Sequence, residues 1–207
     1  MTFDTMNAFR NHWYQAGLGL AILLTLALVL WHDRLSDFRL ILCISLITLF
    51  LHQFEEYQWP GTFPRMLNST LFKSERPDRF PLNANTSWII NVFLGWLLYA
   101  AAIVAGEHAV WLAIAAILVS CGNVIAHTVL FNLKGRTLYN AGLATALTLF
   151  LPLTITFFVF IARHHLAHPA SLVTGLVLGA LINYFGVLRL ITLLADKNTP
   201  YVFTPFR

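Results

Sequence analysis

Six long apolar stretches dominate this chain of 207 residues and restrict what it can fold into. Hydrophobic residues make up 58% of the sequence and charged residues 11%, against roughly 25% charged residues in soluble domains. Each stretch has about the 17–25 residues that a helix needs to cross a hydrocarbon core of about 30 Å. Because lipid offers exposed backbone groups no partner, segments of this length must be helical. The sequence predicts an all-α, integral membrane bundle of six transmembrane helices, over residues 14–31, 40–58, 88–106, 109–133, 139–162 and 171–194.

Basic residues fall unevenly on the two sides of the membrane that six spans define. One side receives both termini, the 59–87 loop and the 134–138 loop, and with them ten of the thirteen Lys and Arg residues. Because cytoplasmic loops carry an excess of basic residues, we expect both termini to be cytoplasmic. The ten residues are Arg10, Arg65, Lys73, Arg76, Arg79, Lys134, Arg136, Arg189, Lys197 and Arg207, against Arg34, Arg39 and Arg163 on the other side.

The chain is expected to form one transmembrane domain over residues 1–207, in the inner membrane of a bacterium. Its net charge of +4 fits anchoring at a membrane surface, and nothing indicates binding to nucleic acid. Both cysteines lie inside apolar spans, so we expect no disulfide framework.

One histidine and two glutamates stand at the end of the second span. They belong to the segment 52–56 (HQFEE), which follows the apolar run at 40–51. Ionisable groups in a membrane are costly and therefore mark functional sites. On a helix, Glu55 and Glu56 lie three and four residues after His52 and share its face. This arrangement suits a metal ion or a proton-transfer site.

Further polar residues are expected at the same depth. His52 lies roughly 9 Å from the cytoplasmic end of its span, and His127 in the fourth span lies roughly 10 Å from its own. Ser120, Asn123 and His127 share one helix face, which can line a pocket together with the face of His52. Other spans add asparagines to this layer, namely Asn91, Asn140 and Asn183.

These motifs resemble those of the HXXEE-motif family of small multi-spanning membrane proteins. The resemblance rests on His52-x-x-Glu55-Glu56, followed by YQWPG at 57–61, and on Asn123-x-x-x-His127. It extends over most of the chain in length and span pattern. The resemblance supports these residues as a site and implies no particular reaction.

Two histidines and a glutamate match the open zinc sites of hydrolases and the facial triad of non-haem iron. We expect His52, Glu56 and His127 to bind a divalent metal, zinc in preference to iron. Glu55 is then the expected catalytic general base, and the two glutamates could exchange roles. The charge of the metal would offset the cost of burying two carboxylates.

Other side chains are expected to support the site. Asn123, one turn before His127, would orient its imidazole, and Asn91 and Asn183 are further candidates for such a role. In the 59–87 loop, Arg76 and Arg79 are candidates for holding a lipid phosphate.

These features predict a metal-dependent membrane enzyme, a hydrolase that acts on a lipid or amphipathic small molecule entering from the bilayer. One alternative is a metal-free acid–base enzyme, an isomerase or cyclase that uses Glu and His on an apolar substrate. Another is a lipid carrier or proton-coupled transporter. Many transporters are built from inverted repeats, and the two halves of this chain show no such repeat. The fourth is a buried hydrogen-bond network that only joins helices. Membrane lipids are the expected partners, and the oligomeric state stays open.

Overall fold

The structure, a computed structural model, describes residues 3–203, with side chains from residue 8, and every regular element in that range is a helix. The prediction of an all-α protein is therefore confirmed. Arg207, one of the ten basic residues counted on the side of the termini, lies outside the described residues. The α-helices are α1 (Phe3–Trp31), α2 (Asp37–Tyr57), α3 (Phe63–Met66), α4 (Ala84–Trp88), α5 (Leu97–Ala105), α6 (Val110–Ile125), α7 (Phe131–Gly135), α8 (Leu143–Thr145), α9 (Leu151–Arg163), α10 (Pro169–Leu181) and α11 (Leu190–Leu193).

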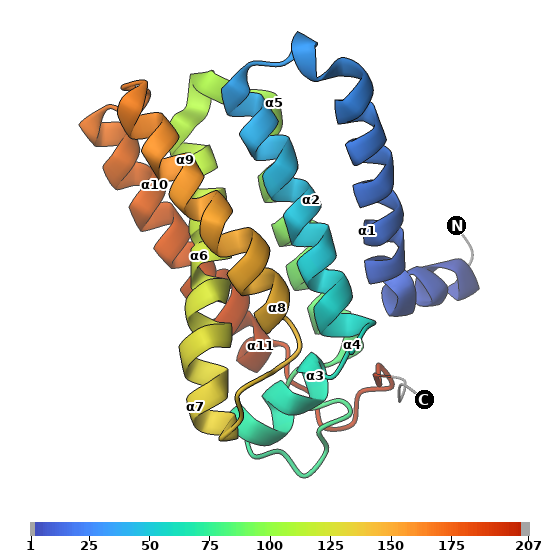
Figure 1. Cartoon of the computed structure of the whole chain (residues 1–207). Coiled ribbons are helices and arrows are strands. Elements are labelled where there is room, and N and C mark those ends of the chain that lie inside the picture. The colour runs from blue at the N-terminus through green and yellow to red at the C-terminus, as the bar shows by residue number, and fades with distance from the viewer. Residues whose placement is uncertain (1–2, 204–207) are drawn as a thin grey trace.

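Within residues 3–203, five helical segments are long and apolar enough to cross a membrane, and the predicted count of six is wrong. The difference lies at 88–106 and 109–133, which belong to one unbroken helical segment of 52 residues, Ala84–Gly135. Helical structure continues through the 3-10 turn Gly106–Ala109, where the chain folds back so that α5 packs against α6 (Figure 1). Gly106 permits this turn because its φ of 53° favours glycine. The five segments are Ala8–Arg34, Asp37–Tyr57, Ala84–Gly135, Leu143–Arg163 and Pro169–Leu193.

Helix α6 forms the centre of the bundle and contacts α2, α5, α9 and α10, while α1 lies at the edge against α2 (Figure 1). Its side chains from Ala113 to Ile117 are almost fully buried. On α10, a Cβ added at Gly175 would lie 2.6 Å from the Cβ of Ile114, and one at Gly179 would lie 2.7 Å from Leu118. The small residues of α10 therefore allow a close approach to α6.

Five π-helical stretches interrupt the α-helices in the described part of the chain. Such wide turns are rare and occur often at functional sites. Asn91, His127 and Asn183 each lie in one of them, and Thr145 directly precedes another. The stretches are η2 (Leu67–Leu71), η3 (Ile89–Trp96), η5 (Ala126–Leu130), η6 (Ala146–Phe150) and η7 (Ile182–Arg189).

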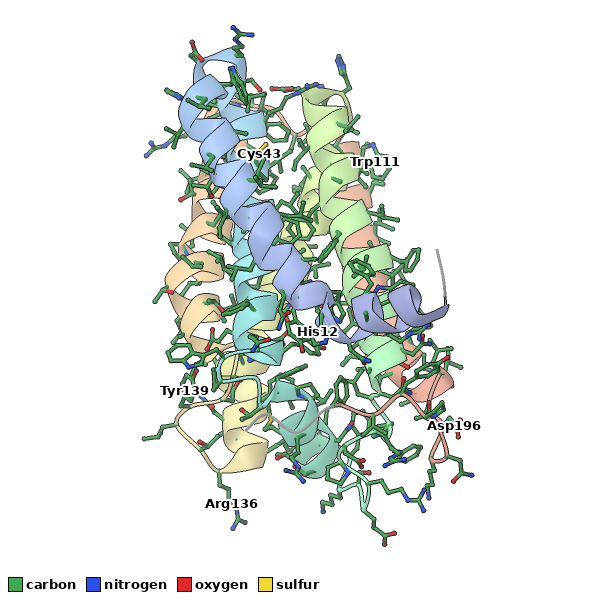
Figure 2. All side chains as sticks on the ribbon, turned by 90° about the vertical axis from the view of Figure 1, so that its right-hand side faces the viewer. His12, Cys43, Trp111, Arg136, Tyr139 and Asp196 are labelled. Atoms are coloured by element: carbon green, nitrogen blue, oxygen red, sulfur yellow. The ribbon has the colours of Figure 1, made fainter. Side chains whose placement is uncertain are left out.

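The two ends of the bundle differ in their connections. Figure 2 shows Arg136, Tyr139 and Asp196 toward one end, with Cys43 and Trp111 toward the other. The N- and C-terminal parts of the chain both lie toward the first end, beside the loop that carries α3 (Figure 1). Backbone hydrogen bonds join the C-terminal segment to this loop: Ala84 N donates to Tyr201 O at 3.1 Å, and Phe203 N donates to Asp78 O at 2.9 Å. This end also contains the polar layer described next.

Candidate metal centre

Two histidines and one glutamate meet inside the bundle. His52 and Glu56 lie on α2 and His127 lies in η5, so the structure brings together the three residues predicted to bind a metal. Glu56 Oε1 is 3.6 Å from His52 Nε2 and 3.2 Å from His127 Nε2. One ligand atom from each residue lies within 4.8 Å of the other two. The side chains are buried, with exposed fractions of 1% for His52, 5% for Glu56 and 0% for His127.

These separations suit a small divalent ion. Zinc–nitrogen and zinc–oxygen bonds of about 2.0–2.1 Å in tetrahedral geometry place neighbouring ligand atoms roughly 3.3 Å apart. The two distances to Glu56 Oε1, 3.2 and 3.6 Å, lie on either side of that value. Three protein ligands would leave one position of a tetrahedral ion for water or substrate.

Asn140 fixes the orientation and the tautomer of His127. Its Nδ2 donates to His127 O at 2.9 Å and to Asn132 Oδ1 at 2.7 Å, so its Oδ1 is the atom facing the imidazole. That oxygen accepts a hydrogen bond of 2.6 Å from His127 Nδ1. Because Nδ1 carries the hydrogen, Nε2 of a neutral His127 directs its lone pair at Glu56, as in a metal-binding histidine.

Thr145 fixes the orientation and the tautomer of His52. Its hydroxyl has one hydrogen, which it donates to Glu55 Oε2 at 2.5 Å, so the oxygen accepts from His52 Nδ1 at 2.8 Å. The lone pair of His52 Nε2 then faces Glu56. This buried nitrogen has no hydrogen-bond partner among the described residues. Leaving a buried polar atom without a partner is costly, and a metal ion would satisfy it.

Glu55 faces away from this group of three residues. Its carboxylate accepts from the backbone N–H groups of Ala144 at 3.1 Å and Thr145 at 2.8 Å, at the start of the segment Leu143–Arg163. Helix starts stabilise negative charge. The hydroxyl of Tyr139 adds a bond of 2.9 Å. Burial and this bond to Glu55 raise the pKa of Tyr139 to about 12, so the phenol stays a donor at neutral pH. The contacts of Glu55 fit a residue that orients His52 through Thr145 better than the general base expected from the sequence.

Gly142 packs directly against the ring of His127. A Cβ added here would lie 2.7 Å from Nδ1 and 2.9 Å from Nε2 of His127. Its φ of 104° also favours glycine. The close approach of backbone to imidazole therefore depends on the absence of a side chain.

The three asparagines predicted to support the ligands have different positions. Asn123, expected to orient His127, lines a cavity together with His52 and Glu56 and donates to Val119 O at 3.0 Å. Asn91 lines the same cavity and accepts from Gln53 at 3.0 Å. Asn183 instead donates to Leu118 O at 3.0 Å and joins η7 to α6. The sequence did not indicate the orienting roles of Asn140 and Thr145, whose bonds to the two histidines join segments far apart in the chain.

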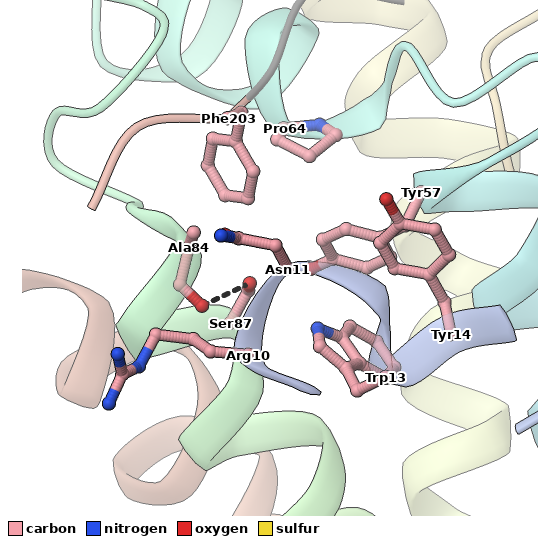
Figure 3. Close-up of a pocket in the computed structure, with 9 residues that line it drawn as sticks. All are labelled: Arg10, Asn11, Trp13, Tyr14, Tyr57, Pro64, Ala84, Ser87 and Phe203. Carbon is pink, nitrogen blue, oxygen red and sulfur yellow. Dashed lines mark hydrogen bonds between the residues drawn. The ribbon is translucent and has the colours of Figure 1, made fainter. Parts of the chain in front are cut away.

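A cavity of about 80 Å³ adjoins two of the three residues, His52 and Glu56. Six polar side chains line it: His52, Gln53, Glu56, Tyr57, Asn91 and Asn123. The rest of its lining is apolar and comes from α2, α3, α5, α6, α11, the neighbouring π-helical stretches, and Leu82 in the loop before α4. Tyr57 separates this cavity from a smaller one of about 20 Å³, in which its ring lies against Trp13 and Tyr14 (Figure 3).

The two arginines expected to bind a lipid phosphate have protein partners. Arg76 donates to Lys197 O at 2.9 Å and to Asn198 Oδ1 at 3.3 Å. Arg79 forms an ion pair of 2.7 Å with Asp78, and its hydrogen bond to that carboxylate lowers the pKa of Asp78. Neither arginine lines the cavity beside Glu56.

The fold and the buried residues define a class: an all-helical protein with membrane-length helices and a histidine–glutamate centre between them. The chain belongs to the HXXEE family, because the family model described as "protein of unknown function with HXXEE motif" matches residues 43–157, more than half of the chain. The resemblance inferred from the motif is therefore confirmed. The matched range includes all three candidate ligands together with Asn140 and Thr145. Neither the curated proteins nor the solved structures contain a match to this chain.

Proposed function

We propose that His52, Glu56 and His127 bind a divalent metal and that the protein is a metal-dependent membrane enzyme, a hydrolase of lipid or amphipathic substrates. Zinc is the favoured ion, with iron as the alternative. The observation that carries the proposal is the convergence of two Nε2 lone pairs on one carboxylate oxygen, while each Nδ1 is held by an oxygen behind it. A bound zinc would supply Lewis acidity and a water of lowered pKa.

The sequence left open which glutamate binds the metal, and the geometry favours Glu56. Glu56 Oε1 faces both imidazoles, whereas Glu55 accepts four hydrogen bonds elsewhere. In this proposal Glu55 is a positioning residue that acts on His52 through Thr145. The expected roles of Arg76 and Arg79 toward a lipid phosphate are not part of it.

A metal-free acid–base enzyme is the second candidate, and one distance favours it. Glu56 Oε1 and His127 Nε2 lie 3.2 Å apart, within hydrogen-bond reach. If Nε2 carries a lone pair, a protonated Glu56 would donate to it, and the pair could then move a proton to an apolar substrate.

We also propose that the chain is one transmembrane domain with both termini in the cytoplasm. The excess of basic residues on the loops of one side supports this orientation. The centre would then lie in the cytoplasmic half of the membrane, where lipid could reach it from the bilayer.

Metal analysis of the purified protein tests the proposal. We expect about one equivalent of zinc or iron in the wild type and its loss in both His52→Ala and His127→Ala, because a centre with three protein ligands does not survive removal of one. His32→Ala, which removes an exposed histidine, is the matched control and should retain the metal. A wild-type protein that stays metal-free after incubation with zinc would leave the acid–base enzyme as the better proposal.

The threonine behind His52 gives a second prediction. Thr145→Val keeps the shape of the side chain and removes the acceptor for His52 Nδ1, so we expect zinc affinity to fall roughly 10- to 100-fold. Thr145→Ser retains the hydroxyl and should bind zinc nearly as well as the wild type. Competition with a chromophoric chelator measures both. Equal affinity in the valine and serine variants would contradict the orienting role.

A further inference from the structure

The cavity beside His52 and Glu56 has a polar part with apolar parts on either side. The polar part holds these two residues with Gln53 and Asn123. Leu49, Leu98 and Val119 line the apolar part nearer to the Gly106–Ala109 turn along their own helices, and Phe63, Leu82 and Ile191 line the opposite one. A molecule that fills the cavity would therefore carry its polar group next to the candidate metal and its hydrocarbon against an apolar part.

The charges of the lining argue against an anionic ligand group. No Lys or Arg belongs to the lining, and proteins usually hold phosphate with those residues. The donor in the polar part is a neutral amide: Gln53 gives one Nε2 hydrogen to Asn91 and accepts from Trp96 Nε1 at 2.8 Å. An amide nitrogen has two hydrogens, and within the described chain the second one remains for a ligand oxygen.

We propose that this cavity takes the acyl end of a neutral, single-chain ester or amide, with the carbonyl oxygen near Gln53 and His52. The inference rests on the proposed function and names its class of substrate. Hydrolysis would break the acyl C–O or C–N bond, with water giving its hydroxyl to the acyl carbon and its hydrogen to the leaving alcohol or amine. At about 80 Å³ the cavity holds the reacting group and the first carbons of the chain, and not a whole phospholipid.

Gly95 offers a way to close the cavity without touching a candidate ligand. It belongs to the lining, and a Cβ added there meets Ile90 O at 3.6 Å, Gln53 Nε2 at 3.7 Å and Leu49 at 3.8 Å. These are ordinary contacts, so Gly95→Ala is expected to be accommodated. The larger side chain of Gly95→Leu would extend into the cavity over Gln53. Val119→Phe would narrow the apolar part on the α6 side as an independent variant.

The test uses 1-monododecanoylglycerol and dodecyl phosphate, which share a chain and differ in the charge of the head group. Native mass spectrometry of detergent-purified protein counts the molecules bound. We expect the wild type and Gly95→Ala to bind the monoacylglycerol, and Gly95→Leu and Val119→Phe to bind it at least about tenfold more weakly. Dodecyl phosphate bound as tightly as the monoacylglycerol, or unchanged binding in both enlarged variants, would overturn the inference.

Zinc content measured on the same samples separates this inference from the proposed function. Gly95→Leu should retain as much zinc as the wild type, because the atoms nearest to a Cβ at Gly95 belong to Ile90, Gln53 and Leu49 and to no candidate ligand. If the wild type binds zinc but not the monoacylglycerol, the substrate class is wrong and the metal proposal stands. If the monoacylglycerol binds in the expected pattern without any metal, the cavity inference stands and the metal enzyme does not.

Discussion

Glu56→Gln is expected to purify without metal and to gain no thermal stability from added zinc. The substitution keeps the size of the side chain and removes the charge that would balance the ion. A ligand that binds only the folded state stabilises it by about 2.7 kcal/mol when present at about 100 times its Kd. The wild type should therefore unfold at a higher temperature with zinc than with a chelator, and Glu56→Gln at the same temperature in both.

Comparing the stability of Glu56→Gln and the wild type in chelator distinguishes a metal centre from a hydrogen-bond network that only joins helices. Burying a carboxylate without its counter-charge is costly, so metal-free Glu56→Gln should be at least as stable as the metal-free wild type. A variant that is clearly less stable than the wild type in chelator would show that Glu56 serves to join helices. Gln58→Glu, at a partly exposed position just after α2, controls for a general effect of exchanging these two side chains.

Gly142→Ala is expected to lower both the stability of the protein and its affinity for zinc. The added Cβ would overlap the ring of His127, and a φ of 104° is unfavourable for alanine. Strain of this kind costs on the order of 1–3 kcal/mol before any clash is counted. Thermal unfolding of detergent-purified protein and chelator competition would measure the two effects.

Two further variants show whether the clash with His127 causes the loss. Gly19→Ala adds a Cβ that meets nothing within 4 Å and should leave stability and zinc affinity unchanged. In the double variant His127→Ala with Gly142→Ala, the ring is gone, so the second substitution should cost less stability than it does in the wild type. Equal costs in both backgrounds would mean that the ring does not rest on Gly142.

The membrane-length helices could be predicted because a helix that crosses a membrane requires a long segment of apolar residues, which is visible in the sequence. The error in their number arose at Gly106, where turn residues between two apolar runs suggested a break in helical structure. The structure continues the helical hydrogen bonding through a 3-10 turn instead. Hydropathy records where the chain leaves the apolar region and carries no information about the hydrogen bonds of a tight turn.

The candidate ligands could be predicted in part because buried ionisable residues are rare enough to be noticed singly. His52 and Glu56 are four residues apart on one regular helix, α2, so their common face followed from the period of 3.6. His127 was paired with them by its depth, by the polar face it shares with Ser120 and Asn123, and by the resemblance to the family motif. It lies in a π-helical stretch where the period of 3.6 does not hold. Thr145 and Asn140 were missed as orienting groups because their roles depend on hydrogen bonds between helices, which no local pattern encodes.

The π-helical stretch around His127 holds one more residue in its turn than an α-helix would. Such a wide turn accommodates the extra residue with little change in the rotation of the helix before it relative to the helix after it. His127 in the stretch and Asn132 just after it both bond to Asn140. Deleting one residue between them would therefore close the stretch to α-helix and keep both residues near their present relative rotation. A relative shortened by this single residue would keep the same helices and would still bring the candidate ligands together.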